Sequence, residues 1–212
     1  GKIAMKDSNF FYMEKKIYIA VVGPTAAGKE TVFKIVKEIF GPYPNVAVGI
    51  HRFSDPLNEM LDLMHLPKSR PNQQLLSTVL RQAFGENLLG KILEKRARNN
   101  PAKIVFLDGV RRPKDVEMLK TLGGENAKSF LLYIDAPIEE RHKRLRLRAD
   151  RPDDAEKTFE DFLKEQSAEP ELLITSLKEH ADWVLDNSAS DKEFKLLKLQ
   201  VAAFWLQKVE KA

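Results

Sequence analysis

The chain has 212 residues, 43% hydrophobic and 31% charged, which fits one soluble globular domain with room for a small inserted lid. It has no cysteine, which excludes disulfides and thiolate metal sites, and no apolar run long enough to span a bilayer. No signal sequence is recognisable, so we expect a cytoplasmic protein, and the net charge of +4 fits phosphate binding as readily as nucleic-acid binding.

The first predicted element is a buried strand over Ile17–Val22, a run rich in β-branched apolar residues. The run ends at Gly23, and Gly28-Lys29 then opens a segment with apolar residues at helical spacing as far as Phe40. A strand, a Gly-x4-Gly-Lys loop and a helix are the context of a phosphate-binding P-loop, whose N–H groups face anionic oxygens. The helix N-terminus and the Lys29 ammonium would add positive charge.

One position departs from the strict P-loop pattern. The residue after the lysine is normally a Ser or Thr that ligates Mg²⁺, whereas here it is Glu30, and Thr31 comes one place later. The strand before the loop and the helix after it still favour a P-loop over an ordinary glycine-containing turn.

A second strand is predicted over Val46–Phe53. Ser54-Asp55-Pro56 follows it and is typical of a helix start, with a capping side chain and a proline in the first turn. Apolar residues at helical spacing then recur as far as Leu93. We therefore expect about 54–100 to form a mostly helical region between the second and third strands.

The third strand is predicted over Lys103–Leu107 and ends in Asp108-Gly109. A short helix over Pro113–Leu122 and a fourth strand over Ser129–Ile134 follow.

The C-terminal part continues the alternation. A helix after Asp135-Ala-Pro137 carries a run of basic residues, and two more helical segments, separated at Pro170, come after it. A short fifth strand is predicted over Ala181–Asn187, and a last helix from about Asp191.

Strands that alternate with helices predict a parallel sheet with right-handed crossovers. Ligands of such sheets bind beyond the carboxyl ends of the strands. The polar residues at these ends are Gly23 onward, Asp55, Asp108 to Arg112, and Asn187.

Asp108 closes an apolar strand at the place where a P-loop enzyme needs an acid near its metal, although such an Asp can also cap the following turn. Arg111 and Arg112 follow on the same edge, and guanidinium groups match the oxygens of a phosphate. Adjacent arginines are often solvated surface residues, but beside a P-loop a phosphate clamp is the better interpretation.

The basic helix carries Arg141, Arg144, Arg148 and Arg151 at spacings of 3, 4 and 3, which places them near one face if the helix persists. One interpretation is a solvated or nucleic-acid-binding face. The other is a lid whose arginines close over a triphosphate. We favour the lid because Pro-Asp-Asp follows Arg151 directly and breaks the helix.

These motifs resemble those of one known family. Gly23-Pro-Thr-Ala-Ala-Gly-Lys-Glu-Thr31, Asp108-Gly-Val-Arg-Arg112 and Arg151-Pro-Asp-Asp154 are similar to the motifs of the nucleoside monophosphate kinases, a family of P-loop phosphotransferases. Adenylate kinases carry Gly-Lys-Gly-Thr, Asp-Gly-Phe-Pro-Arg and an Arg-rich lid with an Asp-Asp pair. The resemblance covers about Lys16 to Lys208. It departs from the family at Arg111, which replaces a proline, and after the Asp-Asp pair, where no Arg follows at the family's spacing.

The resemblance implies ATP and Mg²⁺ as cofactors, with Lys29 on the β- and γ-phosphates, Thr31 on the α-phosphate and Asp108 organising the water shell of the metal. The nucleotide contacts that it implies are Gly23, Ala26, Ala27, Gly28, Lys29, Glu30, Thr31, Arg141 and Asn187. The catalytic residues that it implies are Lys29, Asp108, Arg112, Arg144 and Arg148.

Two further segments refine the resemblance. Phe53-Ser-Asp-Pro-Leu57 and the residues after it resemble the acceptor region of phage-type deoxynucleoside monophosphate kinases. The implied acceptor contacts are Asp55, Arg70, Gln74, Arg81, Arg111 and Arg112. Ala181–Asn187 resembles the last strand of dephospho-coenzyme A kinases, whose following loop meets the adenine of ATP. The Asp-Ala-Asp acceptor motif of those kinases is absent after the second strand.

The acceptor can also be argued from its chemistry. A phosphate acceptor is already an anion and needs arginines, whereas a hydroxyl acceptor needs a carboxylate base within hydrogen-bond reach. Four arginines and one candidate acid, Asp55, are available here, which favours a phosphate acceptor. If the acceptor is a hydroxyl, Asp55 becomes the candidate base. We expect ATP-dependent phosphoryl transfer to a nucleoside or deoxynucleoside monophosphate.

Two alternatives stay open. One is a P-loop kinase of another small metabolite, such as dephospho-coenzyme A or phosphomevalonate. The other is a non-catalytic P-loop protein that senses nucleotides or binds nucleic acid. Under the main hypothesis the partners are ATP and a small phosphorylated acceptor, and we expect neither a membrane nor a nucleic acid as a partner.

The expected architecture is that of a P-loop NTPase, in three layers α/β/α around a five-stranded parallel sheet. A kinase domain over 16–208 would carry the helical acceptor-binding insertion at about 54–100 and the Arg-rich lid at about 141–157. Residues 1–15 and 209–212 are expected to be tails.

Overall fold

The computed structural model describes residues 15–42, 46–148, 154–167, 169–189 and 194–210. Most of the expected N-terminal tail, Arg151 of the expected lid and the expected start of the last helix at Asp191 lie outside these ranges. Within the described part of the chain, no helix combines the length and the apolar character needed to cross a membrane.

Five parallel strands form one sheet in the order β2-β3-β1-β4-β5. The strands are β1 (Lys16–Val22), β2 (Val48–Arg52), β3 (Ile104–Asp108), β4 (Ala127–Asp135) and β5 (Trp183–Asp186). The helices are α1 (Lys29–Phe40), α2 (Asp55–Leu63), α3 (Arg70–Phe84), α4 (Leu88–Asn99), α5 (Pro113–Leu122), α6 (Ile138–Arg148), α7 (Phe159–Gln166), α8 (Glu169–Ser176) and α9 (Lys195–Phe204). A 3₁₀ turn, η2 (Leu177–His180), and a π-helical turn, η3 (Trp205–Val209), complete the described elements.

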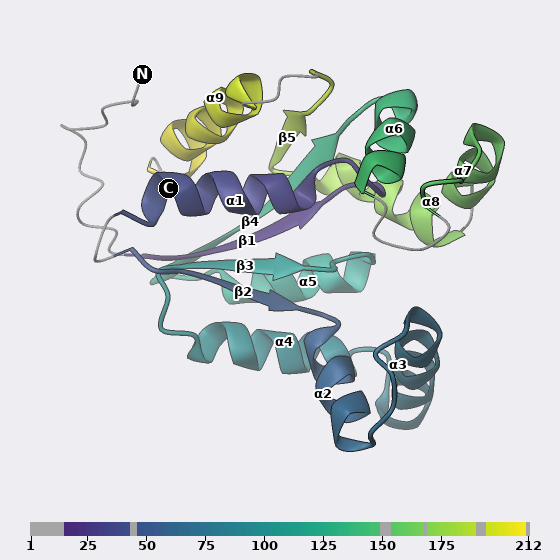
Figure 1. The fold of residues 1–212 in the computed structure, drawn as a ribbon. Coiled ribbons are helices and arrows are strands. Elements are labelled where there is room, and N and C mark those ends of the chain that lie inside the picture. Colours follow the sequence, from purple (N-terminus) through teal and green to yellow (C-terminus); the bar gives the residue numbers. More distant parts are fainter. Residues whose placement is uncertain (1–14, 43–45, 149–153, 168, 190–193, 211–212) are drawn as a thin grey trace.

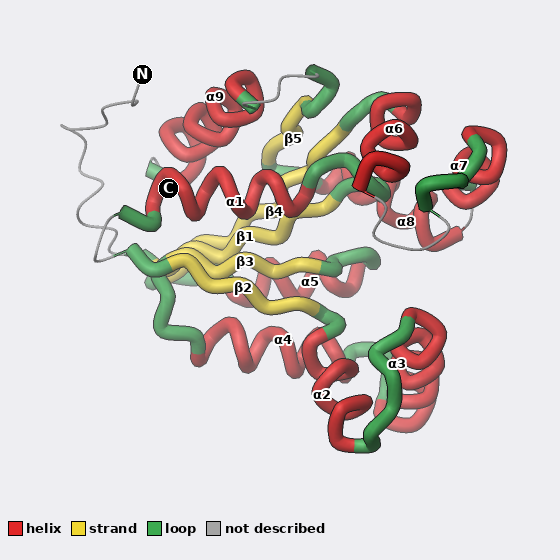
Figure 2. The backbone as a smooth tube through the Cα atoms, in the orientation of Figure 1, coloured by secondary structure: helices red, strands yellow, loops and turns green. Residues whose placement is uncertain are grey.

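The sheet separates two hydrophobic cores, as the alternation of side chains along a strand requires. Ile17, Ile19 and Val21 of β1 point into the core covered by α1 and α9. Tyr18 and Val22 point into the core covered by α4 and α5. Figures 1 and 2 show these helices on opposite faces of the sheet. The predicted three-layer α/β/α arrangement of a P-loop NTPase is therefore confirmed.

The differences from the expected boundaries have simple causes. The two strands at the sheet edges, β2 and β5, are shorter than the expected runs over 46–53 and 181–187, because the pairing of β2 with β3 covers only Val48–Arg52 and that of β5 with β4 only Trp183–Asp186. Helix α8 begins at Glu169, so Pro170 lies in its first turn and does not separate two helices there. A proline is tolerated in that turn because its missing N–H has no partner within the helix.

Two helical arms flank the carboxyl edge of the sheet, where the strands end (Figure 1). The arm formed by α2 and α3 lies at one side, and none of the residues of α3 is buried. The arm formed by α6, α7 and α8 lies at the other side. The expected acceptor region and the expected lid region therefore face the same edge from opposite sides.

The C-terminal turn η3 is anchored on the helix that follows the P-loop. The Trp205 side chain is only 2% exposed, and its ring lies 4.2 Å from the ring of Phe40, between centroids. Val209 is buried as well, so the packed body extends to the end of this turn.

We predict that Trp205→Ala lowers the free energy of unfolding by about 3–5 kcal/mol, because it leaves a large cavity under α1. Urea denaturation followed by circular dichroism measures this loss. Leu206→Ala is the matched control, because the neighbouring Leu206 is 42% exposed and its loss should change stability little. Equal losses in the two variants would contradict this assignment of the anchor.

Candidate functional site

The phosphate-binding loop is pressed against the ends of β4 and β5. A Cβ atom on Gly23 would lie 2.3 Å from the carbonyl oxygen of Ile134. Gly28 has a φ of +111° and caps α1, and a Cβ atom there would lie 2.4 Å from the Nδ2 atom of Asn187. Only glycine fits at these two positions. The two glycines of the Gly-x4-Gly pattern are therefore required because the loop backbone lies so close to Ile134 and Asn187.

Lys29 begins α1 and folds back over the loop. Its ammonium donates hydrogen bonds to the carbonyl oxygens of Gly23 (2.7 Å) and Pro24 (3.2 Å). The ammonium therefore lies at the centre of the loop, where the resemblance to P-loop kinases would place the phosphates.

Burial changes the pKa of the Lys29 side chain. The pKa of Lys29 is lowered from its ordinary value of 10.5 to about 8, mainly by desolvation and to a smaller extent by the cations of Arg111 and Arg148. The carboxylates of Asp108 and Glu171 act in the opposite direction. Charged groups from β3, α6 and α8 thus act on one ammonium, and an added anion would favour its charged form.

A small pocket surrounds this ammonium. Its polar and charged lining residues are Thr25, Lys29, Asp108, Arg111 and Glu171, and its apolar ones include Val22, Val110 and Ile174. Predicted site residues from the P-loop and from the end of β3 therefore meet here. Glu171 and Ile174 of α8 were not predicted, because their helix is far from the P-loop in sequence and its pattern suggests only packing.

Asp108 reaches the pocket from the end of β3. Gly109 follows with a φ of +94°, which turns the backbone away from the strand. The Asp108 carboxylate is partly exposed and pairs with the Nε atom of Arg52 at 3.4 Å. Within the described ranges, no three His, Asp or Glu side chains gather closely enough to hold a metal ion by themselves.

The predicted acceptor arginines Arg81 and Arg112 converge on one carboxylate. Arg112 Nη1 donates to Glu86 Oε2 at 2.9 Å, and Arg81 Nη1 lies 3.9 Å from the same oxygen. Arg81 is largely buried, and its Nε atom donates to the carbonyl oxygen of Ser77 (3.0 Å). The two guanidinium groups thus form a fork that already holds an anionic oxygen.

The backbone of the two adjacent arginines is fixed by α5. The N–H groups of Arg111 and Arg112 donate to Asp115 Oδ2 at 3.0 and 3.1 Å. Burial raises the pKa of Asp115 to about 6, whereas the bond from the Arg111 N–H acts to lower it. The two arginine side chains therefore project from a rigid helix start.

The other predicted acceptor residues lie along the same arm. Asp55 begins α2, and its Oδ2 atom accepts a hydrogen bond from the Arg52 N–H at 2.7 Å. Arg70 and Gln74 are exposed on α3. The fold does not bring these two side chains to the pocket around Lys29, and Asp55 supports the turn after β2.

The predicted site arginines of α6, Arg141, Arg144 and Arg148, differ in their burial and in their contacts. Arg141 is buried and donates to the carbonyl oxygens of Thr25 and Ala136, both at 3.2 Å, and to the side chain of Gln166. It thus links the P-loop to α7. Arg148 is exposed, yet its charge reaches Lys29.

Arg144 lies between these two arginines along the helix. Its Nη2 atom donates to the carbonyl oxygen of Asn187 at 2.8 Å. Its Nη1 atom is buried and has no hydrogen-bond partner among the residues that the structure describes. A further acceptor for this guanidinium would therefore be stabilising.

Asn187, Glu30 and Ala26 were also predicted to contact the nucleotide. Asn187 is 4% exposed, and its side-chain amide donates to the carbonyl oxygen of Ala27 at 2.7 Å, so it braces the loop from behind. Glu30 is exposed and does not line the pocket, which relieves the conflict between its charge and bound phosphates. Ala26 adopts a φ of +62° in the loop.

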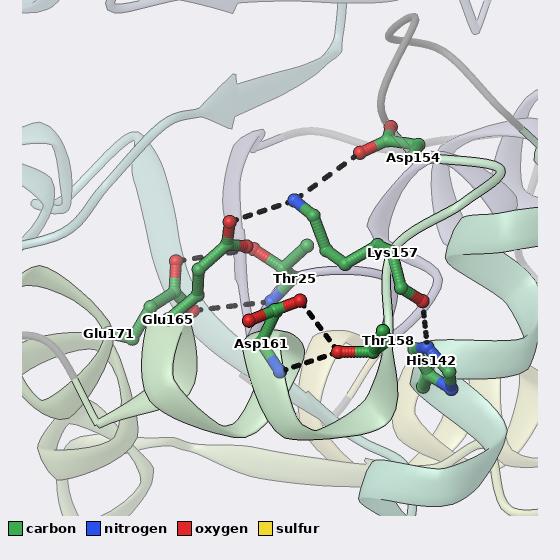
Figure 3. Close-up of polar contacts among 8 residues, drawn as sticks. All are labelled: Thr25, His142, Asp154, Lys157, Thr158, Asp161, Glu165 and Glu171. Atoms are coloured by element: carbon green, nitrogen blue, oxygen red, sulfur yellow. Dashed lines mark hydrogen bonds and ion pairs between the residues drawn. The ribbon is translucent and has the colours of Figure 1, made fainter.

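The segment after α6 is held by buried charges (Figure 3). Lys157 Nζ lies 2.8 Å from Glu165 Oε1 and 3.7 Å from Asp154 Oδ1, and both Lys157 and Asp154 are buried. The His142 ring bonds to the carbonyl oxygen of Lys157 at 2.7 Å. The described residues 154–157 of the expected lid are thus held against α6 and α7.

Comparison with solved structures bears on the fold. Shikimate kinase from Bacteroides thetaiotaomicron superposes with a TM-score of 0.52 at 13% identity, over 92% of this chain and 99% of that one. At this identity the likeness shows a shared fold alone, which is a P-loop kinase-like fold.

Comparison with protein sequences shows the family. No family model matches the chain. The UPF0200 protein of Pyrococcus abyssi is 29% identical over 179 residues, which cover 84% of this chain and 90% of that protein. The UPF0200 protein of Thermococcus kodakarensis is 30% identical over 179 residues, which cover 83% of this chain and 91% of that protein. Identity at this level over nearly the whole of the relative shows that the chain belongs to the UPF0200 family.

Proposed function

We propose that the protein transfers the γ-phosphoryl group of ATP to the phosphate of a nucleoside or deoxynucleoside monophosphate. The observation that carries this proposal is the fork of Arg81 and Arg112, which holds the Glu86 carboxylate. A site that holds one anion between two guanidinium groups has the charge and the donors to bind a phosphate. The kinase-like fold supports a phosphotransferase role.

In this proposal the P-loop N–H groups and Lys29 bind the donor phosphates. Asp108 lines the same pocket, and a Mg²⁺ held mainly by waters and phosphate oxygens fits a site with this single nearby strand-end carboxylate. When bound, the ion would neutralise charge on the phosphate oxygens. Arg111 and Arg148, whose charges act on Lys29, would offset charge on the transferred group.

The reaction needs no base. An oxygen of the acceptor phosphate forms a bond to the γ-phosphorus, and the bond from that phosphorus to the bridging oxygen breaks and leaves ADP. The acceptor oxygen is already anionic, so no proton has to be removed. The use of the Asp55 carboxylate to support the turn after β2 agrees with this chemistry.

A panel of acceptors tests the proposal. ADP release is measured with nucleoside and deoxynucleoside monophosphates, dephospho-coenzyme A and phosphomevalonate. Turnover with the monophosphates is the expected result. Turnover only with one of the other metabolites would favour the alternative kinases. ATP binding without any turnover would favour a nucleotide-sensing protein.

We predict that Lys29→Ala lowers the rate of phosphoryl transfer at least about a hundredfold, because a single preorganised charge stabilises the transition state by several kcal/mol. Steady-state kinetics with the best acceptor measure this loss. Lys34→Ala is the control, because Lys34 is an exposed lysine of the same helix. If Lys29→Ala transfers the phosphoryl group as fast as the control, the proposed role of the P-loop lysine in the reaction is wrong.

We predict that Arg112→Ala raises the KM of the acceptor about 10- to 100-fold and changes the KM of ATP much less, because a charged hydrogen bond to the acceptor is lost. Arg98→Ala removes an exposed arginine that pairs with Glu94 of α4 and bonds to the Thr121 carbonyl of α5, and it should change neither KM. A larger change in the KM of ATP than in the KM of the acceptor would indicate that Arg112 binds the donor nucleotide and not the acceptor.

We predict that ATP binding weakens as the pH rises through about 8, by up to tenfold for each pH unit. The depressed pKa of Lys29 means that its amine loses charge in the free protein above this pH, whereas phosphates bind the charged form. Calorimetry from pH 7 to 10 measures the affinity and the proton taken up on binding. Lys29→Arg should show no such step, because a guanidinium stays charged. A constant wild-type affinity over this range would show that the lysine is not desolvated.

A further inference from the structure

A carboxylate of α8 lies on the phosphate-binding loop. The Thr25 N–H donates to Glu171 Oε2 at 3.4 Å, and the Thr25 hydroxyl donates to Glu171 Oε1 at 3.2 Å (Figure 3). Thr25 belongs to the loop between Gly23 and Gly28, whose N–H groups form the anion-binding part of a P-loop. Glu171 thus contacts a group that serves phosphate oxygens in this type of loop.

The same carboxylate lies among the cations of the site. Glu171 and Lys29 line the same cavity, and Arg141 donates to the carbonyl oxygen of Thr25, the residue that Glu171 contacts. The charge of Glu171 raises the pKa of both Lys29 and Arg141 and so favours their charged forms. A backbone N–H, a hydroxyl and two cations around one anionic group are the surroundings that proteins give to a bound phosphate. Here the anion is supplied by the chain itself.

The space that remains is small. The cavity around Lys29 measures about 50 Å³, and Glu171 and Ile174 of α8 form one of its walls. Binding sites for small molecules typically measure roughly 300 Å³ or more. With α8 in this position, the cavity admits a few water molecules and not a polyphosphate.

We propose that Glu171 is an internal competitor of the nucleotide: its carboxylate occupies the place of a phosphate group on the P-loop, and it leaves together with α8 when a polyphosphate binds. This inference rests on the proposed function only in that the P-loop binds a nucleoside triphosphate. The contact between Glu171 and Thr25 would hold the empty protein closed, and ATP would open it.

The arrangement of α8 is compatible with such a movement. Leu172 and Leu173 of α8 are exposed. Among the apolar residues of this helix whose side chains the structure describes, Ile174 is the one that is buried. The following turn η2 is anchored in the core by Leu177, which is fully buried. A movement of α8 about η2 would therefore break few apolar contacts of its described residues besides those of Ile174.

The test compares ATP binding to the full-length wild type, Glu171→Gln and Glu160→Gln by calorimetry, without an acceptor. Glu171→Gln keeps the size of the side chain but removes the charge, so ATP should bind about tenfold more tightly. Glu160→Gln removes the same charge from an exposed pair with Lys164 on α7 and should leave the affinity unchanged. Circular dichroism confirms that each variant is folded.

A second measurement follows the helix directly. Hydrogen exchange of the α8 amides should become faster in the wild type when ATP binds, because the helix leaves the loop. In Glu171→Gln exchange should already be fast without ATP. Unchanged exchange in both proteins would overturn the proposed movement.

The outcomes separate this inference from the proposed function. If Glu171→Gln binds ATP as the wild type does, or more weakly, Glu171 is no competitor, while turnover in the acceptor panel can still establish the kinase. If the variant binds ATP more tightly but no acceptor is phosphorylated, Glu171 is supported as a competitor and the proposed kinase activity is overturned. If neither protein binds ATP, both proposals are overturned.

Discussion

The site depends on the close contact between the P-loop backbone and the ends of β4 and β5. Gly23 lies against the Ile134 carbonyl group, and Gly28 lies against the amide of Asn187. Asn187 in turn donates to Ala27, so the loop is held from behind by the edge of the sheet. This contact sets where Lys29 begins its helix and thereby where the ammonium lies. A loop held this rigidly can present its N–H groups to an anion without paying for reorganisation on binding.

The cations of the site are balanced by carboxylates of the chain. Glu171 lies on the loop beside Lys29, Glu86 lies between Arg81 and Arg112, and Asp108 pairs with Arg52. A buried cation costs free energy unless an anion is close, so Glu171 and Asp108 offset part of the desolvation of Lys29, whereas the exposed pairs of Arg52 and Arg112 contribute little. Each of them lies where the proposed reaction would bring a phosphate or a metal. The same charge pattern that favours phosphate binding therefore also stabilises the empty protein.

The basic helix shows how one sequence pattern can serve two purposes. Arg141 and Arg144 lie on the face predicted for a lid, yet they bond to Thr25 and to Asn187 and so brace the loop. Arg148, one turn further along α6, is exposed and acts on Lys29 through its charge. Spacings of three and four residues place these arginines on one face of the helix. Their distance from the core decides which of them donates hydrogen bonds to backbone carbonyls.

Local pattern was enough for the main features of this chain. The apolar runs and the Gly-x4-Gly-Lys loop predicted a parallel sheet with a P-loop, because side-chain periodicity and the backbone demands of a phosphate loop are read along the chain itself. The placement of Asp108 and Arg111 at one sheet edge followed from the parallel topology. Glu171 and Glu86 could not be predicted, since each meets its partner only through the packing of helices distant in sequence. Tertiary structure alone also decided that Asn187 braces the loop, because a polar side chain at a strand end bonds to whichever group the fold brings within reach.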